Sequence, residues 1–252
     1  MSIEQVAQPF YRLARPDFGH IVFTRGSSIP CLWPQAVTFA RERGGVLQSA
    51  REAIAFRIEA GGQDQADLYH ATRTVALYLK DGGAFYAAID DATDPEQNII
   101  LARAGEGSAA YQTRGRWTLP KTDKYIRGML ARAEKTRRMF AVDEKSPLEL
   151  ATEQAGEVSD FGNHHSMKAI LGDVGEGYAG FLAEKCFSKG WVYTLTPIDL
   201  EPLRLGNGKV EVRLVGLGDE KFSDLYAISA TYRCDGTGIA RGVLPTPIQL
   251  EK

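Results

Sequence analysis

The residues best placed for chemistry lie in a glycine-rich stretch near the carboxyl end, "CDGTGIARG". In it, Gly236, Gly238 and Gly242 surround Arg241. Glycine lets backbone N–H groups approach a phosphate closely, and a planar guanidinium donates to two phosphate oxygens at once. The stretch therefore favours contact with a phosphate diester. The alternative is an ordinary β-connection that uses glycine for positive φ.

A strongly basic segment lies in the middle of the chain. Between residues 112 and 139, nine basic residues stand against two acidic ones, an excess of seven, although the formal net charge of the chain is −2. The basic residues are Arg114, Arg116, Lys121, Lys124, Arg127, Arg132, Lys135, Arg137 and Arg138. The segment 143–160 reverses the sign, with six acids and one base. A polyanionic partner would use such an excess, whereas a solvated helix face with an acidic neighbour is the alternative.

Two other motifs carry weaker signals. His164 and His165 are candidates for acid/base chemistry because imidazole titrates near neutrality, but a helix cap explains them equally well. Gly175, Gly177 and Gly180 match the spacing of a dinucleotide-binding loop between a possible strand and helix. A small-molecule enzyme built around these glycines is therefore an alternative class of function.

The elements that must position these residues fall into three zones. In residues 1–110, "GHIVFTR" predicts a strand, and the segment 34–60 predicts helices with a break at Gly44 and Gly45. A hairpin is expected through Gly82 and Gly83. The zone 111–190 reads mainly as helix, and the zone 191–252 returns to strands with a turn at Asn207 and Gly208. This pattern predicts an α+β fold in which the basic helices form a separate lobe.

Composition narrows the class of protein. The 252 residues are 44% hydrophobic and 25% charged, as in an ordinary soluble globular protein. We expect a cytoplasmic location, because no signal peptide or apolar transmembrane stretch is apparent. Three widely spaced cysteines predict neither a disulfide framework nor a zinc site. No metal or other cofactor is expected.

The strand-rich ends, the basic helical middle and the glycine-rich loop near the carboxyl end together resemble the CRISPR repeat-associated RNA-binding (RAMP) superfamily. Within it, the chain is most similar to the guide-RNA-processing endoribonucleases, in particular the variant of type IV systems. The resemblance departs from the family pattern after Gly242, where Val243, Leu244 and Pro245 replace further glycines.

The resemblance implies an α+β fold of two ferredoxin-like (RRM-like) halves with a basic α-helical insertion between them. The expected domains are 1–110, 111–190 and 191–252, the last carrying the glycine-rich loop. The implied activity is metal-independent endoribonuclease cleavage beside the stem of a CRISPR repeat hairpin. In it the ribose 2′-OH attacks the adjacent phosphate, the bond from phosphorus to the 5′-oxygen of the next nucleotide breaks, and the products are a cyclic phosphate and a free 5′-OH. The enzyme would then stay bound in a ribonucleoprotein complex with other CRISPR effector subunits, with no membrane partner.

The resemblance also implies roles for individual residues. Arginine stays protonated and therefore clamps phosphate rather than acting as a base. The catalytic candidates are Arg25, Arg41, Arg241 and His20. The RNA-binding candidates are Arg43, Arg114, Arg116, Lys121, Lys124, Arg127, Arg132, Arg137, Arg138, Gly236, Gly238 and Gly242. The alternative function is a non-catalytic RNA-binding subunit of a CRISPR effector complex.

Overall fold

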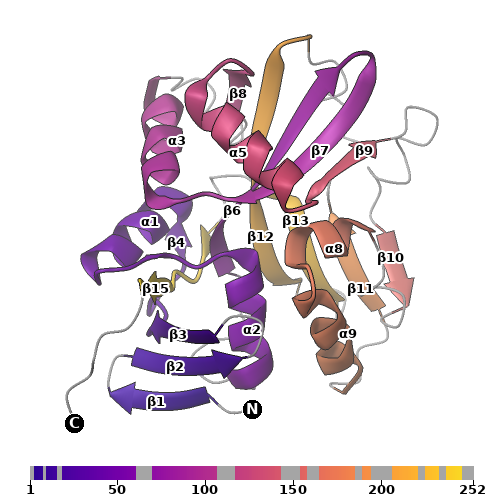
Figure 1. The fold of residues 1–252 in the computed structure, drawn as a ribbon. Helices are drawn as coiled ribbons and strands as arrows, with labels where there is room; N and C mark the ends of the chain where they lie inside the picture. The colour runs from indigo at the N-terminus through magenta and orange to yellow at the C-terminus, as the bar shows by residue number, and fades with distance from the viewer. Residues whose placement is uncertain are drawn as a thin grey trace.

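A computed structural model gives the architecture of the chain (Figure 1). It describes residues 3–7, 10–15, 19–60, 70–106, 117–142, 154–157, 165–184, 189–193, 206–220, 225–232 and 237–245. The described residues form a large sheet, a smaller sheet and a two-stranded ladder, with helices packed against them.

The large sheet is built from strands of the middle and the end of the chain. Its order is β10-β11-β13-β12-β6-β7-β9, and β8 also pairs with β12. The strands are β6 (His70–Asp81), β7 (Ala84–Asp91), β8 (Trp117–Pro120), β9 (Met139–Val142), β10 (Gln154–Glu157), β11 (Lys189–Tyr193), β12 (Lys209–Glu220) and β13 (Leu225–Tyr232). The β11–β13 pair is parallel and the other pairs are antiparallel.

The smaller sheet joins the two ends of the chain. Its order is β1-β2-β3-β15-β5, so the last strand lies between two early ones. The strands are β1 (Ile3–Ala7), β2 (Phe10–Arg15), β3 (Gly19–Thr24), β5 (Val46–Leu47) and β15 (Gly242–Leu244). A two-stranded ladder of β4 (Cys31–Leu32) and β14 (Thr237–Gly238) links the same parts of the chain.

These pairings correct the predicted fold class. Two ferredoxin-like halves would each close their own sheet, with the basic helices inserted between them. Instead β12, from the last part of the chain, pairs with β6 from the first part, and β15 pairs with β3. The chain therefore does not form two ferredoxin-like halves. The reason is long-range strand pairing, which the spacing of apolar residues along the sequence does not reveal.

Helices cover both faces of the large sheet. They are α1 (Trp33–Glu42), α2 (Ala50–Ala60), α3 (Asp94–Glu106), α5 (Lys124–Lys135), α8 (His165–Leu171) and α9 (Val174–Glu184). The predicted break between the first two helices is confirmed, and Gly44 adopts a φ of 75° there. The predicted hairpin through Gly82 and Gly83 is also confirmed, with φ values of 57° and 88°.

The turn expected at Asn207 and Gly208 forms, but the described strands that precede and follow it, β11 and β12, do not pair with each other. Gly208 has a φ of 79°, and β12 begins directly after it. The neighbours of β12 are β13, β6 and β8, whereas β11 pairs with β10 and β13. A local turn signal therefore located the turn correctly but not the partner of the strand that follows it.

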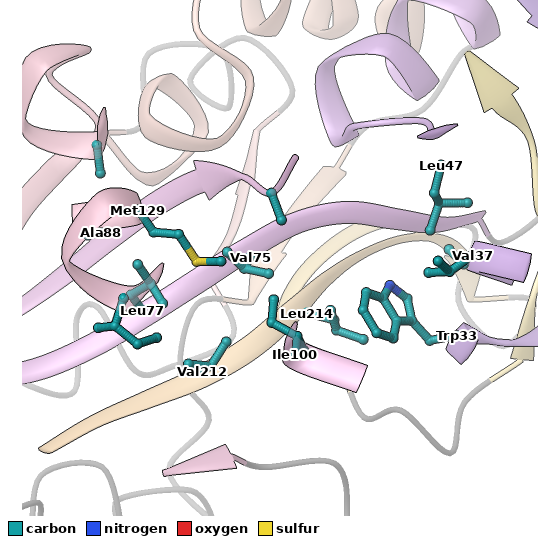
Figure 2. Packing of buried hydrophobic residues seen from close by; sticks show 14 of the residues in the cluster. Trp33, Val37, Leu47, Val75, Leu77, Ala88, Ile100, Met129, Val212 and Leu214 are labelled. Carbon is teal, nitrogen blue, oxygen red and sulfur yellow. The ribbon is translucent and has the colours of Figure 1, made fainter. Parts of the chain in front are cut away.

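The core consists of two main layers, one on each face of the large sheet. Successive residues of β6 point to opposite faces, so Leu77 and Leu79 lie in one layer and Tyr78 lies in the other. Figure 2 shows the first layer, in which Met129 of α5 and Trp33 of α1 approach the sheet. The second layer is covered by α2, α8 and α9. The basic helix α5 is therefore part of the core packing rather than a separate lobe.

Gly45 lies where the chain passes close to β15. A Cβ at this position would stand 2.7 Å from the carbonyl oxygen of Val243, and backbone cannot move aside cheaply. We expect Gly45→Ala to lower the free energy of unfolding by about 2 kcal/mol through this overlap. Gly180→Ala is the control, because that position of α9 is exposed with nothing within 4 Å of an added Cβ. It should raise stability by about 0.5–1 kcal/mol. If Gly45→Ala and Gly180→Ala change the free energy of unfolding in urea equally, the close approach of residue 45 to the Val243 backbone is contradicted.

Among the residues that the structure describes, no helix combines the length and apolar character needed to cross a membrane.

Candidate functional site

Helix α5 carries the basic segment and is held firmly on the sheet. Asp123 caps its amino end by accepting hydrogen bonds from the backbone N–H groups of Tyr125 and Ile126, at 2.8 and 3.4 Å. Ile126, Met129 and Ala133 are buried in the core layer shown in Figure 2. Because these positions follow the three- and four-residue spacing of one helix face, the opposite face points to solvent.

The solvent side of α5 presents a row of cations. Lys124, Arg127 and Lys135 are exposed, and Ala131 continues the same stripe at helical spacing. Arg137, just beyond the helix, is exposed as well. We name Lys124, Arg127, Lys135 and Arg137 the basic face. Within the described part of the chain, none of the four forms an ion pair.

The end of α5 holds Arg137 in an unusual backbone conformation. Its φ of 56° lies in the left-handed region, and no other described non-glycine residue has a positive φ. The N–H of Arg137 donates to the carbonyl of Glu134 at 3.0 Å, and that of Arg138 donates to Ala133 at 2.8 Å. This is the hydrogen-bond pattern of a Schellman motif, in which glycine usually occupies the position of Arg137.

Three other basic residues of the segment form ion pairs with other elements of the fold, and only one of them, Arg138, is largely buried. Lys121 pairs with Asp81 at 2.6 Å. Arg132 pairs with Asp90 at 2.8 Å and with Glu96 at 3.0 Å. These donors hold elements of the fold together, so the structure separates them from the basic face.

Arg138 is the most deeply engaged of the three. Its Nη1 pairs with Asp91 at 2.9 Å, while Nε and Nη2 donate to the carbonyls of Ala169 and Ile170 at 2.7 and 2.9 Å. One guanidinium therefore joins the end of α5, the end of β7 and the carboxyl-terminal turn of α8. The predicted RNA contacts of Lys121, Arg132 and Arg138 would each compete with an existing ion pair, which is at the surface for Lys121 and largely buried for Arg138.

Two consecutive aspartates at the end of β7 anchor these arginines on opposite faces of the sheet. Asp90 faces α5 and binds Arg132, whereas Asp91 faces α2 and α8 and binds Arg138. Burial raises the pKa of Asp90, although the hydrogen bond from Arg132 opposes the rise. Burial alone would also raise the pKa of Asp91. The charges of Arg138 and Arg73 outweigh it, so the net shift is downward and Asp91 is held ionised.

The glycine-rich loop near the carboxyl end packs into the interior. Arg241 has no exposed surface, its Nη1 donates to the carbonyl of Thr24 at 3.1 Å, and its guanidinium lies 3.8 Å from the centre of the Phe56 ring. The N–H of Gly242 donates to the Thr24 hydroxyl at 2.9 Å. A Cβ on Gly242 would stand 3.1 Å from Thr24 Cγ2, so this glycine permits close packing. A phosphate in solution does not reach Arg241 in this arrangement.

The other catalytic candidates lie on different elements. His20 is exposed on β3, and Arg25 is exposed just after that strand. Arg41 of α1 pairs with Asp94 of α3 at 3.0 Å and also donates to Asn98. Arg41 and Arg241 are thus engaged with separate partners, one on the surface and one in the interior.

The remaining RNA-binding candidates are placed as follows. Arg43 is exposed after α1, with its guanidinium 3.5 Å from the centre of the Phe39 ring. Gly238 is buried in β14. Arg114, Arg116 and Gly236 lie outside the described residues.

The alternative motifs find no support in the local structure. Gly175, Gly177 and Gly180 all lie within α9, and the preceding segment is the helix α8 rather than a strand. The strand–turn–helix context of a dinucleotide-binding loop is therefore missing there. His165 begins α8, while His164 lies outside the described residues. In the part of the chain that the structure describes, no group of three or more His, Cys, Asp or Glu side chains could hold a metal ion.

Lys135 belongs to the basic face although the residue roles expected from the sequence left it out. It follows Lys124 by eleven residues, close to three full helical turns, so it lies on the same side of α5. Helical spacing, applied to the basic residues instead of the apolar ones, is the signal that identifies it.

Comparisons with known proteins bear on the fold alone. No protein-family model matches the chain, and no curated protein matches its sequence. One solved structure is similar over 88% of this chain and 94% of its own, with a TM-score of 0.57 and 11% sequence identity. It is described as "Accommodation of massive sequence variation in Nanoarchaeota by the C-type lectin fold". The similarity shows a C-type lectin type of fold.

This finding completes the correction of the predicted ferredoxin-like halves. The fold brings the first and last described strands together in the smaller sheet and leaves α5 on the outer side of the large one. At 11% identity, the similarity carries no information on which residues act.

Proposed function

We propose that this protein binds RNA without cleaving it, through the basic face of α5. The observation that carries the proposal is the division of the basic segment. Lys121, Arg132 and Arg138 are each ion-paired with an aspartate of another element, whereas the four cations of the basic face are exposed with no acidic partner among the described residues. Exposed cations without ion pairs, three of them aligned on one rigid helix and the fourth just beyond its end, are suited to a row of phosphates.

This surface supports a polymer of phosphates as the ligand, and RNA is proposed among such polymers because it is the ligand expected from the sequence. The resemblance to CRISPR proteins implied ferredoxin-like domains, and the fold is of another type. The association with a guide RNA and with CRISPR effector subunits stays a prediction. From the similar solved structure we take only that this type of fold accommodates very different sequences.

The binding function is favoured over the endoribonuclease function by the position of the catalytic candidates. Arg241 is fully buried and Arg41 is paired with Asp94, while cleavage requires several groups to converge on one phosphate. Incubation with labelled hairpin RNA in EDTA separates the two functions. Intact RNA that remains bound is the expected result. A product ending in a cyclic phosphate would instead support the endoribonuclease function.

Removing two charges from the basic face should flatten the salt dependence of RNA binding. For Lys124→Gln/Arg127→Gln, the log–log slope of affinity against salt should fall by about 1.4–1.8, since each lost phosphate contact removes about 0.7–0.9. Fluorescence anisotropy with a labelled RNA hairpin measures this slope. Arg43→Gln/Lys168→Gln is the matched control, because it removes two exposed charges from other elements. Equal slopes for the two double variants would refute the assignment of the basic face.

Replacing Arg137 with glycine should change stability and binding in opposite directions. A left-handed conformation costs a non-glycine residue about 1 kcal/mol, so Arg137→Gly is expected to raise the free energy of unfolding by about that amount. The same change removes one cation of the basic face and should weaken RNA binding several-fold at low salt. Strain retained at an exposed cation is the pattern expected of a functional position.

Both effects of Arg137→Gly are measured on one preparation, by urea unfolding and by anisotropy. Misfolding cannot imitate a more stable protein that binds less well. A variant that gains stability and binds RNA as tightly as the parent would show that Arg137 serves no binding role.

A further inference from the structure

The composition of the basic face bears on which form of RNA it accepts. All residues of α5 are described, and the stripe between Lys124 and Lys135 contains Arg127 and Ala131. Gly128 and Glu134 border the stripe. The one aromatic residue of the helix, Tyr125, is only partly exposed, and the Lys124 ammonium lies 4.7 Å from the centre of its ring. The face therefore combines long cationic side chains with small residues and presents no open aromatic ring.

Proteins that bind single-stranded nucleic acid present exposed aromatic rings. Bases stack on exposed aromatic side chains, and this stacking repays the cost of ordering a flexible strand. A duplex stem does not lose this conformational entropy on binding, because its phosphates are already held in a regular array. A rigid row of cations binds a ligand with rigidly held charges more tightly than a flexible one, because less conformational entropy is lost on binding.

The rigidity of the row follows from the contacts beneath it. Ile126, Met129 and Ala133 pack into the core, and Arg132 fastens the inner flank of the helix to Asp90 and Glu96. From Lys124 to Lys135 the helix rises about 16 Å, at about 1.5 Å per residue. Laid parallel to the axis of a duplex, this length spans about five base-pair steps, taking a rise of about 3.4 Å of axis per step.

Resting on the proposed function, we infer that the ligand of the basic face is a double-helical RNA stem. It is bound through the phosphates of about five base-pair steps, without reading of base identity. Lysine and arginine side chains on an otherwise smooth helix contact the backbone and do not enter the deep, narrow major groove of an RNA duplex. Unpaired RNA would meet the same charges but no surface on which to stack.

The inference is tested with three labelled RNAs that carry equal numbers of phosphates. They are a ten-base-pair stem, a stem of permuted sequence, and an unpaired strand. Anisotropy at one fixed salt concentration should show both stems bound with affinities within about twofold of each other, and the unpaired strand bound about tenfold more weakly. Stems shortened below about five base pairs should lose affinity steeply.

A gain-of-function variant probes the missing stacking surface directly. Ala131→Tyr places a ring in the middle of the basic face and should tighten binding of the unpaired strand about tenfold, with little effect on the stems. Ala102→Tyr, at an exposed position of α3, is the matched control and should change neither.

The outcomes separate this inference from the proposed function. If the unpaired strand binds as tightly as the stems, or the two stems differ by more than about fivefold, the inference is wrong while RNA binding stands. If no RNA binds, the proposed function itself fails. An effect of Ala102→Tyr equal to that of Ala131→Tyr would show that stacking occurs away from the basic face.

Discussion

Replacing Asp91 with asparagine is expected to lower the free energy of unfolding by about 3 kcal/mol at pH 7. The Asp91 carboxylate pairs with Arg138 at 2.9 Å and accepts a hydrogen bond from the Thr74 hydroxyl at 2.5 Å. Arg138 in turn joins α5 to α8. An amide leaves this largely buried guanidinium without its counter-charge, and a buried charge that loses its partner is strongly destabilising.

The neighbouring substitution Asp90→Asn is the matched control and should cost about 1 kcal/mol or less. Burial raises the pKa of Asp90, so its ionised form is disfavoured in the folded protein despite Arg132. Arg132 also keeps Glu96 as a second partner at 3.0 Å. Urea unfolding of both variants at pH 7 measures the difference. If the free energy of unfolding falls equally in the two variants, the contacts of Arg138 do not stabilise the fold more than those of Arg132.

The pH dependence of stability should distinguish the same two residues. The pKa of Asp91 is lower in the folded than in the unfolded chain, so its contribution is present above the unfolded pKa of about 3.9. That contribution is lost as the pH falls through the folded pKa. Asp90 has a raised folded pKa and acts in the opposite sense, since its contribution is lost as the pH rises. Asp91→Asn should therefore flatten the loss of stability in acid, and Asp90→Asn should not.

A second large effect is expected from the ion pair buried within β12. Nε and Nη2 of Arg213 lie 2.6 and 2.5 Å from Oε1 of Glu211, and both side chains are at most 5% exposed. The Arg213 guanidinium also lies 5.7 Å from the ring centre of Tyr78, whose pKa is raised chiefly by burial. Glu211→Leu should cost about 3–5 kcal/mol, because it leaves the Arg213 charge in the core without its carboxylate.

The double variant Glu211→Leu/Arg213→Met is the informative comparison. It replaces both charges by apolar groups of similar size, and such replacements are often neutral or stabilising. We expect its free energy of unfolding to return to within about 1 kcal/mol of the parent. Additive losses in the double-mutant cycle would mean that each residue stabilises the fold independently of the other.

Local features of the fold were predictable from the sequence. The strand at 19–24, the break at Gly44 and Gly45, and the hairpin at Gly82 and Gly83 all form as expected. Each depends on residues close together in the chain, such as glycines at positive φ or apolar residues at helical spacing.

The sheet order was not predictable in this way. Pairing of β12 with β6 joins residues more than 130 positions apart, such as Val210 and Leu79. Either strand alone shows only that it is buried, not which neighbour it has. The prediction of two ferredoxin-like halves failed at this step, since it assumed that strands near in sequence pair with one another.

The sequence by itself determined that the basic middle segment would be helical and that glycines would surround Arg241. Only the tertiary structure decided which cations are exposed. Charge is a property of the residue type, whereas exposure depends on what the fold brings alongside: Asp90 and Asp91 engage Arg132 and Arg138, and the core encloses Arg241. Lys124, Arg127, Lys135 and Arg137 remain exposed, and none of them forms an ion pair with a described acidic residue.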